Sequence, residues 1–97
     1  MKFELKLQRR VIYFISNLTP EDKAQLVHSI EALRLDPYVD NITKFVLPYP
    51  PAVFNLYQDG RFCIIYRLTG NDVVDFLMAG YAPYVPPIHE WDDWRKK

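Results

Sequence analysis

The chain begins with a segment whose apolar residues recur at helical spacing. In "MKFELKLQRRVIYFISNL" these residues are Leu5, Ile12, Ile15 and Leu18, with Val11 and Phe14 beside them. Intervals of three and four residues favour a helix over a strand. The first residues, Lys2 to Leu5, also fit a short edge strand, and the pattern leaves these two alternatives open.

A second helix is predicted from the stretch "TPED" onward. Its start is marked by an N-cap, a proline at the first helical position and two acidic residues that suit the helix dipole: Thr19, Pro20, Glu21 and Asp22. An apolar stripe follows at Leu26, Ile30 and Leu33. The helix ends at Asp36–Pro37, because the residue before a proline avoids helical angles. The two helices, joined by a tight turn, predict a helix hairpin over residues 1–37.

The pattern changes over residues 43–80 to β-rich runs separated by turns. Asp59–Gly60 lies between two such runs, and Asp-Gly is a strong hairpin signal because a type I′ turn needs positive φ at both central residues. A two-residue loop there predicts four facing pairs: Gln58 with Arg61, Tyr57 with Phe62, Leu56 with Cys63, and Asn55 with Ile64. A second turn at "TGND" leads into "VVDFLMAG", which gives three strands in a meander. A short strand at Thr43–Leu47 would be a fourth.

Strand alternation divides the run after Gly60 between two faces of this sheet. Phe62, Ile64, Tyr66 and Leu68 share one face, and Arg61, Cys63, Ile65 and Arg67 share the other. The first face is continuously apolar and is expected to pack against the helices. The second face mixes arginines with apolar residues, so we expect a half-open surface suited to a partner, a ligand or a tail folded over it.

These elements predict the fold class α+β, with an N-terminal helix hairpin packed on a three- to four-stranded antiparallel sheet. The 97 residues, 49% of them hydrophobic, suit a single domain over residues 1–97. Residues 81–97 form a proline-rich tail that carries Trp91 and Trp94. We expect these two aromatic residues to dock the tail onto the domain or to bind a partner.

Composition narrows the function classes further. Equal numbers of acidic and basic residues argue against a protein that coats nucleic acid by bulk charge. A single cysteine allows no internal disulfide, which favours a reducing compartment, and neither a secretory signal nor a membrane span is predicted. We therefore expect a cytoplasmic protein without a membrane partner. Two histidines and one cysteine, far apart, match no metal-ligand spacing, and no cofactor is expected.

The order of these motifs resembles the RelE/ParE superfamily of small bacterial toxins. The matching features are "FISNL", "LRLDP", Gly60, Phe62, the Ile64–Tyr66 run and the strand Val73–Gly80, so the resemblance spans about residues 7–85. It implies a toxin that pairs with an antitoxin. RelE-like members cleave mRNA in the ribosome, whereas ParE-like members inhibit DNA gyrase without nuclease chemistry.

This chain departs from the nuclease branch at the positions that would carry its basic residues. That branch has an arginine directly after the aromatic residue of the Gly-x-aromatic element, where this chain has Cys63, and a basic residue where it has Ala82. Tyr84 is an imperfect counterpart of a tyrosine further along. Phosphodiester cleavage needs a base and cationic donors. Whether the chain is an endoribonuclease is therefore left open by the sequence.

The sequence thus predicts the toxin component of a type II toxin–antitoxin pair, RelE/ParE-like, acting on mRNA at the ribosome or on DNA gyrase. The candidate catalytic or target-contacting residues are Arg61, Arg67, Tyr81 and Tyr84, and the first three are expected to meet the target on the half-open face. The candidate partner-binding residues are Trp91 and Trp94. The alternative is a non-catalytic protein–protein interaction domain with the toxin fold and no toxic activity. A homodimer is compatible with both hypotheses.

Overall fold

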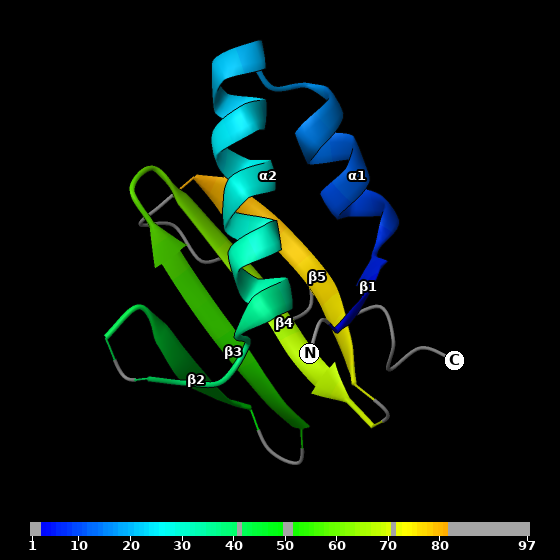
Figure 1. The fold of residues 1–97 in the computed structure, drawn as a ribbon, viewed down its shortest axis with the longest axis vertical. Helices are drawn as coiled ribbons and strands as arrows, with labels where there is room; N and C mark the ends of the chain where they lie inside the picture. The colour runs from blue at the N-terminus through cyan, green and yellow to red at the C-terminus, as the bar shows by residue number, and fades with distance from the viewer. Residues whose placement is uncertain (1–2, 41, 50–51, 71, 82–97) are drawn as a thin grey trace.

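Two antiparallel helices lie across one face of a five-stranded sheet (Figure 1). The computed structural model describes residues 3–40, 42–49, 52–70 and 72–81. In chain order the elements are β1 (Glu4–Leu7), α1 (Arg9–Ser16), α2 (Pro20–Leu35), β2 (Lys44–Tyr49), β3 (Ala52–Asp59), β4 (Phe62–Thr69) and β5 (Val73–Tyr81). The α+β class and the helix hairpin on one face of the sheet are confirmed.

The N-terminal segment is an edge strand followed by a helix, so the structure selects the edge strand from the two alternatives that the sequence left open. Glu4 to Leu7 pair with Val73 to Phe76 of β5 in parallel, and α1 begins only at Arg9. The physical reason is that "ELKL" alternates with period two, which places Leu5 and Leu7 against the helix-side core while Glu4 and Lys6 take the other face. This segment becomes a strand because β5 offers it a free edge.

Helix α2 begins and ends where the sequence predicts. The Thr19 hydroxyl accepts a hydrogen bond from the backbone N–H of Asp22 at 3.3 Å, and Pro20 occupies the first turn. Leu26, Ile30 and Leu33 are buried on the face that meets the sheet. The helix ends at Leu35, just before Asp36–Pro37.

The sheet has the strand order β1-β5-β4-β3-β2. Strands β2 to β5 form the predicted antiparallel meander, including the fourth strand before β3. The fifth strand, β1, adds to the far edge in parallel with β5, so the sheet is mixed rather than purely antiparallel. Because β1 precedes both helices, the chain crosses the sheet to reach β2 through the helix hairpin.

The register of the β3–β4 hairpin differs from the predicted one by two residues. Tyr57 faces Ile64 and Asp59 faces Phe62, so the turn consists of Gly60 and Arg61 rather than Asp59 and Gly60. Gly60 has φ of +60°, and Asp72 is the one described non-glycine residue with positive φ. Positive φ at the first central residue alone is typical of a type II′ turn, which has glycine there. Since side chains alternate with period two, a shift of two leaves every strand residue on its predicted face.

The sheet therefore carries an apolar cluster on each face. The helix-side core combines residues from the sheet and both helices: Val11, Leu26, Ile30, Leu33, Phe62, Ile64, Tyr66, Val74, Phe76 and Ala79, with Phe3. The opposite side is named here the helix-free face, and its cluster consists of Phe54, Leu56, Cys63, Ile65, Leu77 and Met78. A β-bulge contributes to it, because Ile65 faces Met78 while Tyr66 faces Phe76, and Leu77 is left between.

Candidate functional site

Arg67 lies on the helix-free face, beside a buried carboxylate. Lys6, Asp75 and Arg67 are in register across β1, β5 and β4. The Asp75 side chain is 2% exposed, and its Oδ2 lies 3.5 Å from Nε of Arg67. Its Oδ1 accepts a hydrogen bond from Nε2 of Gln8 at 3.0 Å. Arg67 is thus held against the sheet by an ion pair, on the face that strand alternation predicts.

Arg61 does not lie on that face, so its predicted placement is wrong. It is a turn residue, and its guanidinium donates a hydrogen bond to the carboxylate of Asp22 on α2. The guanidinium carbon also lies 6.0 Å from the centre of the Phe62 ring, which belongs to the helix-side core. Because Arg61 sits in the turn rather than in β4, strand alternation does not fix its direction, and the carboxylate of α2 draws it to the helix side.

Tyr81 also lies on the helix side, contrary to the predicted grouping. Its ring stacks on Phe62 at 5.4 Å and meets Phe14 of α1 edge-on at 5.3 Å. Tyr81 faces Phe62 directly across β4 and β5, so the two residues share a face. The bulge at Leu77 shifts the alternation of β5 by one residue, and the sequence gives no signal of that shift. Tyr81 is half exposed.

The three described candidates therefore occupy two sides of the sheet, with Arg67 on one and Arg61 and Tyr81 on the other. Tyr84, Trp91 and Trp94 lie outside the described residues. Cys63 lies in the middle of the helix-free cluster and is fully buried. Burial raises the pKa of its thiol, which disfavours the reactive thiolate. Cys63 is thus a core residue.

The carboxylate partners of the arginines are the residues that sequence reasoning missed. Asp75 is a charged residue within the apolar strand "VVDFLMAG", which is a signal of a buried ion pair. The sequence marks Asp22 only as part of a helix N-terminus, but the side chain is largely buried and faces the β3–β4 turn. Asp75 pairs with Arg67, and Asp22 pairs with Arg61.

A second polar site lies in the loop between α2 and β2. The Asp40 carboxylate accepts hydrogen bonds from the backbone N–H groups of Ile42, Lys44 and Thr43 at 2.8–2.9 Å. These donors hold the pKa of Asp40 well below its usual range. Nζ of Lys44 lies near both Asp36 and Asp40, at 3.7 and 3.8 Å from their carboxylates. The arrangement holds the loop in shape, and it pairs the charge of Lys44 with the two carboxylates.

The same loop is tied to the sheet by Tyr66. Its hydroxyl donates a hydrogen bond of 2.6 Å to the carbonyl oxygen of Pro37, and both residues are buried. Burial, together with the nearby charges of Asp40 and Asp36, raises the pKa of Tyr66. The hydroxyl therefore stays protonated and remains a donor. Tyr66 is a structural residue between the loop and the helix-side core.

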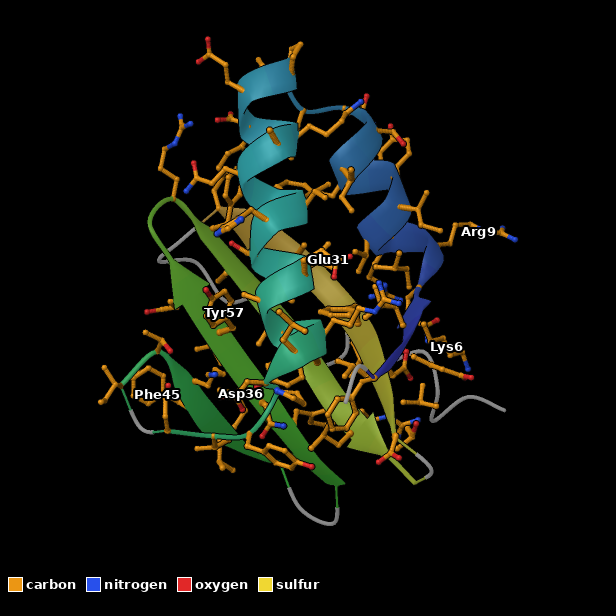
Figure 2. All side chains as sticks on the ribbon, in the orientation of Figure 1. Lys6, Arg9, Glu31, Asp36, Phe45 and Tyr57 are labelled. Atoms are coloured by element: carbon orange, nitrogen blue, oxygen red, sulfur yellow. The ribbon has the colours of Figure 1, made fainter. Side chains whose placement is uncertain are left out.

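Two exposed cations, Lys6 of β1 and Arg9 at the start of α1, lie close together in the sequence. Figure 2 shows both side chains extending away from the sheet and the helices. Arg9 lies in the first turn of α1, where no acidic residue is present. Neither contacts the candidates named above in any described interaction.

The described residues contain no cluster of three or more His, Cys, Asp or Glu side chains that could hold a metal ion. Within the same ranges, neither helix combines the length and the apolar composition needed to cross a membrane.

A helix hairpin on one face of a meander, closed by an N-terminal parallel strand, defines a small α+β fold. The chain matches no protein-family model and no curated protein sequence significantly. Solved structures do match. The RelBE2 toxin–antitoxin complex from Mycobacterium tuberculosis has a chain with a TM-score of 0.70 at 16% identity, covering 84% of this chain and 99% of that one.

Two further structures agree with this match. The archaeal RelE–RelB complex from Pyrococcus horikoshii gives a TM-score of 0.69 at 15% identity, with 88% of this chain and 100% of the other covered. A mutant of the Escherichia coli toxin RelE in the free state gives 0.57 at 13% identity, with 86% of each chain covered. This chain has the RelE-like toxin fold.

Proposed function

We propose that this chain is the toxin component of a type II toxin–antitoxin pair. The observation that carries the proposal is the fold, because it matches nearly the whole length of chains from two toxin–antitoxin complexes. The partner in this proposal is an antitoxin protein, and the site of action is the cytoplasm.

Of the two targets, DNA gyrase fits the surface chemistry better than mRNA at the ribosome. RNA cleavage needs cations that are free to stabilise a phosphorane-like transition state. Cys63 replaces the arginine of the nuclease branch and is buried among apolar side chains. Arg61 and Arg67 each lie beside a carboxylate of the chain itself. These features favour a toxin that acts by binding a protein target.

Inducible expression in a host without the adjacent reading frame tests the proposal. We expect growth arrest that is relieved by co-expressing the protein encoded next to this gene. In arrested cells, plasmid supercoiling should change and mapped mRNA ends should not. New mRNA ends with unchanged supercoiling would reject gyrase as the target and support the nuclease.

The arginine candidates are tested in the same system. If Arg61 and Arg67 contact the target, the double variant Arg61→Ala/Arg67→Ala should restore growth. The matched control is Lys6→Ala/Arg9→Ala, which removes two exposed cations. Thermal unfolding must first establish that both variants fold. The control should stay toxic. If the Arg61→Ala/Arg67→Ala variant were as toxic as the control, neither arginine would contact the target.

The second candidate function is a non-catalytic interaction domain with the toxin fold. The specific observation in its favour is that both candidate arginines are already paired within the chain. Normal growth at high expression of soluble, folded protein would establish this alternative and reject the toxin proposal.

A further inference from the structure

The cluster on the helix-free face is as deeply buried as the helix-side core. Phe54, Cys63 and Ile65 have no exposed surface, and Leu77 is 1% exposed. A sheet face that meets only solvent leaves its side chains accessible. Burial to this degree is typical of a sheet face that other atoms cover.

The described elements outside the sheet all lie on the other side. Both helices cross the opposite face (Figure 1). The loop after α2 is also on that side, because Pro37 accepts the hydrogen bond of Tyr66, and Tyr38 meets Phe3 edge-on at 5.8 Å. Both Tyr66 and Phe3 belong to the helix-side core. None of these described segments can therefore cover Cys63 or Ile65.

One long stretch of chain remains, and it starts next to the cluster. Strand β5 ends at Tyr81, and Gly80 faces Cys63 in the register of β4 and β5. Residues 82–97 follow and include Val85, Ile88, Trp91 and Trp94. Sixteen residues can span about 50 Å when extended, whereas adjacent strands are about 4.8 Å apart. The segment is long enough to cross β4 and β3 with residues to spare.

We propose that the C-terminal segment, residues 82–97, covers the helix-free face and packs Trp91 and Trp94 against its apolar cluster. Large aromatic side chains suit this position because the face offers a continuous apolar surface. The face is then a second core of the chain rather than a free binding surface. RNA or a protein target would have to use other surfaces. The inference does not depend on the proposed function.

Tryptophan fluorescence of the full chain tests this assignment directly. Both tryptophans of the protein lie in the segment, so the emission reports on nothing else. We expect an emission blue-shifted relative to the chain in urea, and at least about a threefold lower quenching constant for acrylamide. Emission and quenching that do not change on unfolding would overturn the proposal.

The single cysteine reports on the face itself. In the full chain, alkylation of Cys63 by iodoacetamide should be slow. The variant Trp91→Ala/Trp94→Ala should accelerate it by at least about tenfold, because the cover is weakened. The matched control is Tyr13→Ala, an exposed aromatic residue of α1 on the other side of the sheet, which should leave the rate unchanged.

Circular dichroism must show that the variants are folded. If they are not, the tryptophan fluorescence of the unmodified chain alone tests whether the C-terminal segment covers the face. A folded double variant whose Cys63 stays as protected as in the full chain would overturn the proposal. Protection that increases with protein concentration would assign the cover to a second copy of the chain, and would also overturn it.

Discussion

At the scale of single residues, the two arginines show why a side chain's direction depends on its partner. Arg67 sits inside β4, so alternation alone directs it to the helix-free face, where Asp75 meets it. Arg61 sits in a turn, and the carboxylate of Asp22 directs it to the other side. The charge of Asp75 within an apolar strand is a sequence signal for the first pair, whereas the burial of Asp22 is visible only in the structure.

Tyr66 gives a prediction at this scale. Replacing it with phenylalanine keeps the ring in the core but leaves the buried carbonyl of Pro37 without its donor. We expect Tyr66→Phe to lower the free energy of unfolding by about 1–3 kcal/mol, measured by urea denaturation. Tyr13→Phe, which alters a largely exposed ring on α1, is the control and should change it little. Equal losses in both variants would contradict the role of this hydrogen bond.

Asp40 gives a prediction about pH. Its pKa is lowered in the folded chain by the backbone N–H donors of the loop, the first of which is Ile42. A carboxyl whose pKa is depressed by folding contributes stability above its unfolded pKa of about 4, and loses that contribution as the pH falls below this value. The urea midpoint of the unmodified chain should therefore fall between pH 5 and pH 3 more than that of Asp40→Asn. Parallel pH profiles would rule out this contribution.

At the scale of elements, the turn between β3 and β4 sets the register of the hairpin, which the strand patterns alone do not fix. The apolar alternation of β4 tolerates any register that differs by two residues, because the same side chains then face the helices. Asp-Gly suggested that the turn includes Asp59, but the structure places Gly60 and Arg61 in it. A type I′ and a type II′ turn both favour glycine, so the dipeptide alone does not choose between them.

Gly60 tests this turn. With φ of +60° it occupies the left-handed region, and an added Cβ would lie 2.9 Å from Nε2 of Gln25. We expect Gly60→Ala to cost about 1–2 kcal/mol of unfolding free energy. Gly70→Ala is the matched control, because Gly70 has no positive φ and no atom within 4 Å of its added Cβ. Chemical denaturation of both variants gives the comparison, and equal stability of the two would contradict the turn geometry.

At the scale of the whole molecule, the central strands of the sheet have the most pairing partners and the deepest burial. β4 is bonded to β3 and β5, and β5 is bonded to β4 and β1, whereas β1 and β2 are edge strands. The middle of β4, from Ile64 to Tyr66, is also buried on both faces. The long-range pairing of β1 with β5 joins the first and the last of the described strands.

Amide hydrogen exchange tests this gradient. We expect the slowest exchange in β4 and in the part of β5 that pairs with it, and the fastest strand exchange in the edge strands β1 and β2. The reason is that opening an edge strand exposes little apolar surface, whereas opening β4 exposes both cores. Protection of β2 equal to that of β4 would mean that the sheet opens as one unit.

The sequence by itself determined the class of fold, the limits of α2 and the division of β4 between two faces. Each of these follows from local chemistry. Thr19 caps the start of α2, Pro37 limits its end, and the alternation of Phe62, Ile64 and Tyr66 assigns the faces of β4. These signals act over a few residues, so they can be read without knowing what lies beside them.

Only the tertiary structure decided the strand character of β1, the register of the β3–β4 hairpin and the sides of Arg61 and Tyr81. Leu5 becomes part of a strand because β5 presents an edge, and Arg61 turns toward Asp22, which is 39 positions earlier in the chain. Tyr81 changes side because of one bulge at Leu77. In each case the partner is distant in sequence, and local patterns carry no information about distant partners.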